Sequence, residues 1–458
     1  MTRMAGPVKN LVFACLLAAC LATPILPSQA QGRTPIRDTE IEATIRAFAT
    51  PLFNAAGLNP DAVRIYIIKD ETLNAFVAGG QNLFLNSGLL MATDSPGQLI
   101  GVIAHETGHI AGGHLARTSG AIRDTSNSAL FGLLLGAATT LATGRPDVGI
   151  AVFQGTSAAG VNALLRYSQS QESAADHAAT RLLDATRQSS KGFYEFLETL
   201  SGQELLAPER RSQYANTHPL TRDRIAFARN HAANSPFTDV PPPTEFVAMH
   251  QRMVAKLAGF LLSPSRTFQR YPETDKSLPA RYARAIATYQ EPATVRALEL
   301  TDDLIAERPM DGYFWELKGQ ILAESGQPER AREAYIKALE LLGDAPLVEA
   351  ELARAELAIN TEDSNKSALR HMENAIRDME TSAFAWRQLA TAQGRNDMPG
   401  ELALSLAEEA LLRNRIKDAI QQARRAQHHL KRGEPGWLRA LDIETVAKQR
   451  LADRDRRR

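Results

Sequence analysis

Residues able to bind a metal ion and activate water stand together at His105-Glu106-Thr107-Gly108-His109. On an α-helix, four residues make slightly more than one turn, so both imidazoles emerge on one face. Two imidazoles placed in this way can bind one Zn²⁺ at about 2.0–2.1 Å. Glu106 projects beside them and can take a proton from a metal-bound water. The spacing predicts His105 and His109 as zinc ligands and Glu106 as a base.

A catalytic zinc needs a third protein ligand and an open fourth position. His114 would lie about 180° around a continued helix from His105, so we expect it to face away from the metal. Glu172 and Asp176 are four residues apart, share a helix face and have only small residues between them. We expect one of these carboxylates to bind zinc, and the other either to orient a ligand or to act as an acid.

The elements that must position these residues occupy residues 31–240. Asp38–Ala56 reads as a helix, and Ser95-Pro96 begins another that should continue to about Arg117. Further helices should carry Glu172 with Asp176 and cover residues 191–200. We expect β-strands at 63–68, 74–78 and 82–85. Residues 82–86 are our candidate for an exposed edge strand, with which an extended substrate could pair.

The second half of the chain reads as paired helices that follow a Pro-rich boundary near residues 236–243. Small or apolar residues recur there about every 34–37 residues, which resembles tetratricopeptide repeats. They are Ala297, Ala331, Ala368 and Ala403, and then Leu304, Ala338, Ala375 and Ala410. The predicted fold is mainly α: an α+β metallopeptidase domain with a small β-sheet, and then an all-α repeat domain. The expected divisions are a signal peptide (1–30), the metallopeptidase domain (31–240), a helical connector (241–278), repeats (279–450) and a basic tail (451–458).

The first 30 residues have the form of a secretory signal peptide. A positive start at Arg3 and Lys9 precedes the apolar run 11–22, and Ser28-Gln29-Ala30 provides a small-x-small cleavage site. The chain is therefore predicted to be exported to the periplasm. Leu17-Ala18-Ala19-Cys20 offers an alternative, in which Cys20 becomes a lipid-anchored first residue.

Composition excludes several other classes of protein. Lys plus Arg and Asp plus Glu both number 52, so no net positive charge favours nucleic acid, and we expect no such partner. The 2 cysteines are Cys15 and Cys20, which excludes a disulfide framework from the body of the chain. Residues 129–163 are rich in Gly, Ala and Leu. They predict a helical hairpin over the cleft that either packs in the core or contacts a membrane surface.

These motifs together resemble the gluzincin-type peptidase family M48. The resemblance rests on His105-Glu106-x-x-His109 with Glu172 and Asp176 downstream, on the strand and helix motifs Asn74-Ala75-Phe76 and Ser87-Gly88-Leu89-Leu90, and on Thr217-His218-Pro219 followed by Arg224-Ile225. A signal peptide and C-terminal tetratricopeptide repeats indicate an exported branch of that family.

The resemblance implies one zinc ion on His105, His109 and Glu172, Glu106 as general base and Asp176 in the active site, often as proton donor. In the exported branch, the residue matching His218 takes the fourth zinc position and keeps the enzyme latent. An imidazole there would exclude the nucleophilic water. The implied function is a zinc endopeptidase acting on unfolded or stalled envelope proteins, with the repeats contacting outer-membrane assembly machinery. The alternative is a chaperone or docking protein with little proteolysis.

Overall fold

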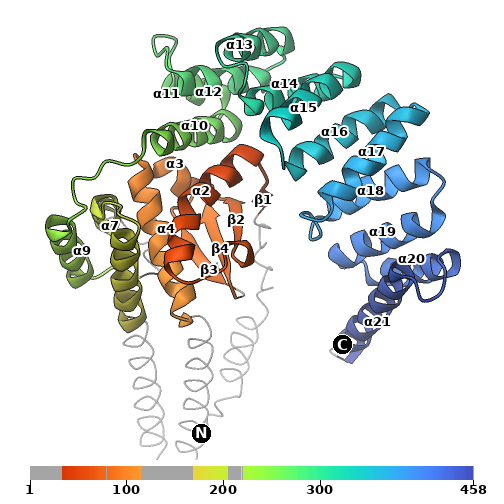
Figure 1. Cartoon of the computed structure of the whole chain (residues 1–458), viewed down its shortest axis with the longest axis horizontal. Coiled ribbons are helices and arrows are strands. Elements are labelled where there is room, and N and C mark those ends of the chain that lie inside the picture. The colour runs from red at the N-terminus through yellow and green to blue at the C-terminus, as the bar shows by residue number, and fades with distance from the viewer. Residues whose placement is uncertain (1–33, 79, 115–168, 205–217, 219, 457–458) are drawn as a thin grey trace, which may run out of the picture.

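The computed structural model describes residues 34–78, 80–114, 169–204, 218 and 220–456. A mixed sheet with surrounding helices forms the N-terminal part, and paired helices continue from it in a long arc to the C-terminus (Figure 1). The predicted fold class, mainly α with a small β-sheet and a helical-repeat region, is confirmed. The predicted signal peptide and the hairpin at 129–163 lie outside the described residues.

The sheet has four strands in the order β1-β2-β4-β3. The strands are β1 (Thr34–Ile36), β2 (Arg64–Lys69), β3 (Ala75–Ala78) and β4 (Asn82–Asn86). β2 and β4 are parallel, with Ile67 opposite Leu85, and the other two pairs are antiparallel. The prediction that residues 82–86 form an edge is wrong, because β2 and β3 flank β4 on both sides. Within the described residues the two edge strands are β1 and β3, and β3 also contacts the helix that carries His105.

Helices cover this sheet and carry the predicted site residues. They are α2 (Thr39–Ala55), α3 (Ser87–Ala92), α4 (Pro96–Ala111), a helix over residues 169–185, α7 (Lys191–Glu204) and α9 (Arg222–Asn234), with a 3₁₀ turn at Pro60–Ala62. The Ser95 side chain caps α4 by accepting from the Gln98 backbone N–H, and the helix is buried along nearly its whole length. α4 ends at Ala111, so the prediction that it continues to Arg117 is wrong.

Two glycines let α4 approach its neighbours closely. A Cβ at Gly101 would lie 2.7 Å from the Cα of Phe193 on α7, and one at Gly108 would lie 2.9 Å from the carbonyl oxygen of Ala175. Real side chains do not tolerate such contacts, so glycine is required at both positions for this packing. Gly108 lies between the two predicted histidine ligands, and the helix that it admits carries Glu172 and Asp176.

The C-terminal part contains helices alone among the residues that the structure describes after 243. They are α10 (Thr244–Leu261), α11 (Pro264–Arg270), α12 (Leu278–Tyr289), α13 (Thr294–Glu307), α14 (Gly312–Glu324), α15 (Pro328–Leu342), α16 (Pro346–Ile359), α17 (Glu362–Ala375), α18 (Ala383–Arg395), α19 (Pro399–Leu412), α20 (Ile416–His429) and α21 (Pro435–Arg456). All eight residues that define the predicted repeat are buried, and they lie on α13, α15, α17 and α19. Each of these four helices packs against the helix that precedes it in the chain. Residues 451–456 continue α21 instead of forming the expected separate tail.

A buried network of charges joins the two parts of the chain. Arg252 and Lys256 on α10 lie between Asp38 and Glu40 at the start of α2 and Glu316 on α14. Lys256 Nζ is 2.8 Å from Asp38 and 3.4 Å from Glu40, and it is almost fully buried. Buried ionic groups are tolerated only when they are paired, so this network fixes how α10 sits on the N-terminal part.

None of the helices described by the structure is both long and apolar enough to span a bilayer.

Candidate metal centre

Four side chains from three separate segments converge at one buried point. His105 and His109 come from α4, Glu172 from the helix at 169–185, and His218 from the segment before α9. Their ligand-capable atoms all lie within 4.8 Å of one another. The distance from His105 Nε2 is 3.1 Å to His109 Nε2 and 3.4 Å to both His218 Nδ1 and Glu172 Oε2. Glu172 Oε1 is 3.3 Å from His109 Nε2 and 3.1 Å from His218 Nδ1.

This geometry fits a metal ion. Ligands at about 2.0–2.1 Å from a tetrahedral zinc are separated from each other by about 3.3–3.4 Å, close to the distances between the four groups. His105 Nε2 faces three other ligand atoms at once, and one proton on that nitrogen cannot form a hydrogen bond to all three. A cation at the centre would satisfy all of these lone pairs. Three imidazoles and one carboxylate are donors that suit zinc.

Asp176 fixes the orientation of His105. Its Oδ1 lies 2.9 Å from His105 Nδ1, so that nitrogen carries the proton and Nε2 directs its lone pair to the centre. Burial opposes protonation of His105, but its hydrogen bonds to Asp176 and Glu172 outweigh burial and raise its pKa to about 9. A proton therefore competes for His105 until a metal ion displaces it. Asp176 contacts a predicted ligand through its outer nitrogen, which favours an orienting role.

Arg224 is a site residue whose role the sequence did not reveal. Its side chain is buried, and its guanidinium donates to both Asp176 oxygens, at 2.7 and 2.9 Å. Its Nη1 lies 2.9 Å from Glu172 Oε2 and donates to the His218 carbonyl at 3.4 Å. Burial raises the pKa of Asp176, but hydrogen bonds from His105 and Arg224 outweigh it, so the pKa is lowered. In the sequence, the indication of this role is that Arg224 follows His218 by six residues within one motif.

His114 also lies at the site, although we predicted that it would face away. Its Nδ1 is 2.9 Å from His109 Nδ1, and its side chain is buried. The reason is the early end of α4: Gly113 has φ +62°, and the chain turns back there. A Cβ at Gly112 would lie 2.5 Å from His114 Nε2, so glycine leaves room for the ring. In the sequence, the Gly112-Gly113 pair indicates that the helix ends there, because helices commonly end at glycine.

Glu106 is completely buried beside the four-residue cluster. Neither of its carboxylate oxygens has a hydrogen-bond partner among the residues that the structure describes. The Nε2 atom of His218 lies 3.4 Å from Glu106 Oε1. A buried carboxylate without a donor is costly to a fold and is characteristic of functional sites. Glu106 is thus available to accept a proton from a group at the metal position.

The model of peptidase family M48 matches residues 35–232. This part of the chain is similar to the peptidases of family M48. The matched segment contains all six predicted site residues and ends within α9. The resemblance stated from the sequence motifs is therefore confirmed, and the six residues surround one centre in the M48 domain.

Relatives extend the similarity beyond the M48 domain. The chain is 26% identical over 428 residues to the Beta-barrel assembly-enhancing protease of Escherichia coli (strain K12). This alignment covers 88% of the chain and 82% of that protein. It is 24% identical to the protein of the same name in Yersinia pestis, with 90% and 84% covered. A Putative beta-barrel assembly-enhancing protease of Vibrio cholerae is 26% identical, with 66% and 69% covered. The first two alignments are long enough to include helical repeats as well as the M48 domain.

Proposed function

We propose that the chain is a zinc endopeptidase of the periplasm, which cleaves unfolded or stalled envelope proteins and is kept latent by His218. The observation that carries this proposal is the convergence of His105, His109, Glu172 and His218 next to Glu106. The names of the relatives support a role in the assembly of outer-membrane β-barrel proteins. The predicted signal peptide supports export, with a lipid anchor at Cys20 as the alternative route.

His105, His109 and Glu172 would hold the metal. Zinc in this position would polarise a peptide carbonyl and lower the pKa of water to about 7. Glu106 would accept the proton of the attacking water and pass it to the leaving amine. Asp176 would keep His105 in the tautomer that binds the metal, and Arg224 would hold Asp176 and Glu172 in place.

The substrate would bind as an extended strand along β3. β3 is one of the two edge strands of the described sheet and contacts α4, so a peptide paired with it would lie beside the metal centre. Backbone pairing is independent of side-chain identity, which suits an enzyme for unfolded chains. This assignment replaces residues 82–86, which are internal to the sheet.

Latency would follow from the number of ligands. Zinc sites with four protein ligands are typically structural, whereas catalytic sites keep one position open. His218 Nδ1 would occupy the fourth corner, since it lies 3.1–3.4 Å from two of the other ligand-capable atoms. Hydrolysis would then require His218 to leave. A client bound to the helical repeats could provide the free energy for that change, if it binds the open form more tightly.

A closed site also fits the alternative, a docking protein of envelope assembly with little proteolysis. The two are separated by casein cleavage and zinc analysis of the full exported chain as wild type, His218→Ala, and His218→Ala combined with Glu106→Gln. We expect His218→Ala to raise cleavage at least tenfold over wild type. The double variant should retain zinc and lose cleavage, because Glu106 is not a ligand. Equal basal activity in wild type and His218→Ala at matched zinc content would contradict latency. Undiminished cleavage by the double variant would contradict the role of Glu106.

A further inference from the structure

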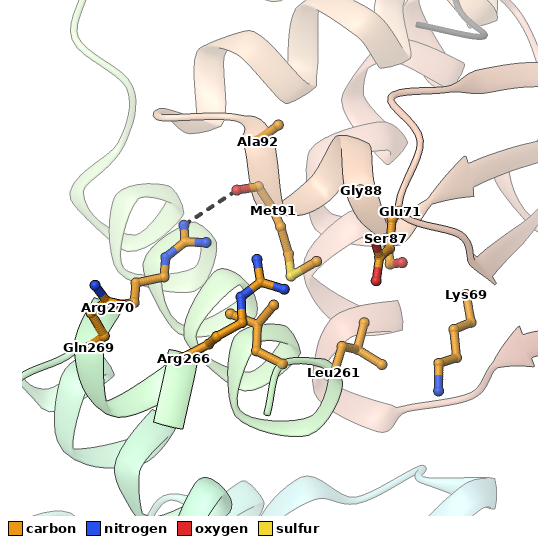
Figure 2. Close-up of a pocket in the computed structure, with 11 residues that line it drawn as sticks. Lys69, Glu71, Ser87, Gly88, Met91, Ala92, Leu261, Arg266, Gln269 and Arg270 are labelled. Carbon is orange, nitrogen blue, oxygen red and sulfur yellow. Dashed lines mark hydrogen bonds between the residues drawn. The ribbon is translucent and has the colours of Figure 1, made fainter. Parts of the chain in front are cut away.

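A hollow of about 470 Å³ lies between the M48 domain and the helices that follow it. One wall consists of Lys69 at the end of β2, Glu71 in the next loop and the start of α3. The other wall consists of the end of α10 and the side chains of α11 (Figure 2). Its volume is in the range of ligand sites, which form preferentially where domains meet. It does not include any residue of the metal centre.

Three cationic side chains and one carboxylate line this hollow. Figure 2 shows Arg266 and Arg270 on one side, Lys69 on the other and Met91 between them. Within the described part of the chain, none of the three cations has a carboxylate at salt-bridge distance. Other cations at the junction, such as Arg252 and Lys256, are paired with acids. The described residues that line the hollow thus carry an excess of two positive charges, with Glu71 as the only acid among them.

Apolar side chains cover the rest of the surface. They are Met91, Ala92, Leu261 and Leu262. A hollow with two guanidinium groups one helical turn apart and an apolar wall favours a ligand that combines a carboxylate with an apolar group. The carboxylate of Glu71 disfavours dianions such as phosphate. The last residue of a polypeptide has the required combination of groups, and its backbone N–H can donate to Glu71.

The walls are held in place before any ligand binds. Gly88 N–H donates to the Asp70 carbonyl, and the Ser87 hydroxyl both donates to that carbonyl and accepts from the Asp70 N–H. These bonds fix the loop that carries Glu71 against α3. On the opposite wall, Arg270 Nη2 donates to the Met91 carbonyl at 3.4 Å and so connects α11 to α3. A preformed site loses little conformational entropy when it binds.

We propose that this hollow binds the C-terminal residue of a polypeptide client, with its carboxylate on Arg266 and Arg270 and its side chain against Met91 and Leu261. The identity of the ligand as a polypeptide rests on the proposed function. The hollow would act as a docking site separate from the cleavage site. A client held there would bridge the M48 domain and the helical connector.

The test uses the full exported chain with Glu106→Gln, so that binding is measured without hydrolysis. The probe is a fluorescein-labelled nonapeptide without acidic residues that ends in leucine, either with a free carboxylate or with a carboxamide. Fluorescence anisotropy should give at least tenfold weaker binding for the carboxamide. The double variant Arg266→Gln and Arg270→Gln should bind the free-carboxylate peptide at least tenfold more weakly. Its affinity for the carboxamide peptide should equal that of the parent protein. Arg296→Gln, an exposed arginine on α13, is the matched control and should change neither.

Equal binding of the two peptides, or equal loss with Arg296→Gln, would overturn the proposal. Displacement of the peptide by 10 mM inorganic phosphate would also overturn it, because it would identify a general anion site. Because binding is measured without hydrolysis, its outcome is independent of whether the chain is an active peptidase. Absence of casein cleavage would contradict the proposed function, whereas the anisotropy measurement would still show whether the hollow binds a C-terminal carboxylate.

Discussion

Replacing Arg224 by methionine should weaken the metal site, although Arg224 is not a ligand. The guanidinium makes contacts of 2.7, 2.9 and 2.9 Å with Asp176 and Glu172 in a setting where its side chain is 5% exposed. Breaking a buried pair costs about 3–5 kcal/mol, because the remaining charges lose their partner. Methionine fills much of the same space without a charge.

The free-energy loss should divide between stability and metal binding. Without the hydrogen bonds from Arg224, Asp176 holds His105 less firmly in the tautomer that binds a metal, so zinc affinity should fall about 10–100-fold. Competition with a chromophoric chelator measures this affinity. Hydrogen exchange of peptides from α4 and residues 169–185 measures local stability. Tryptophan fluorescence is unsuitable, since Trp315, Trp386 and Trp437 all lie in the helices of the C-terminal part.

Arg229 provides the matched control on the same helix. It pairs with Glu198 at 3.2 Å, but both side chains are largely exposed, and such pairs contribute about 0–1 kcal/mol. Arg229→Met should therefore leave zinc affinity and exchange in α4 unchanged. If Arg224→Met and Arg229→Met bind zinc equally well, the bridge between Asp176 and Glu172 does not support the site.

Three further predictions concern the metal site and the buried histidine of α10. Glu172→Ala should lose zinc, whereas Asp176→Asn should retain it with about 10–100-fold lower affinity; metal analysis that finds equal zinc in Glu172→Ala and wild type would place the third ligand elsewhere. His114→Ala should lower zinc affinity by a similar factor, because His109 Nδ1 loses its acceptor, and an unchanged chelator titration would rule this out. Burial lowers the pKa of His250 to about 4. As the pH falls below about 6.5, His250 is therefore protonated in the unfolded chain but not in the folded chain, and the free energy of unfolding decreases until about pH 4. The loss should be about 1.4 kcal/mol per pH unit, seen as faster exchange in α10, and His250→Gln should be insensitive over that range.

Patterns local to one helix were predictable from the sequence. The spacing of His105 and His109 placed both on one face of α4, and the same reasoning placed Glu172 and Asp176 together. Periodicity also located the repeat helices, because buried positions recur wherever helices cross. Each of these predictions depends on a geometric period that a short segment contains in full.

Relations between segments were not predictable in the same way. The order of the strands depends on β4 joining β2 in parallel after the β3–β4 hairpin, which no strand encodes alone. His114 turns inward because α4 ends early. The apolar pattern of the sequence favours a longer helix and the two glycines favour an end, and the sequence alone does not show which effect is stronger. Arg224 lies far in sequence from both acids that it contacts, and an arginine on a polar helix reads as a surface residue.

The contacts of Arg224 also bear on how His218 could leave without collapse of the site. The guanidinium holds Asp176 and Glu172 through three contacts of 2.7–2.9 Å, but it reaches the His218 carbonyl only at 3.4 Å. His105, His109 and Glu172 are on helices that pack closely around Gly108, whereas His218 lies outside any helix. Removing His218 therefore breaks the weakest of these contacts and leaves the three helical ligands and their supports in place. That asymmetry is what a latent metal centre requires, because the fourth position can open while the other three stay fixed.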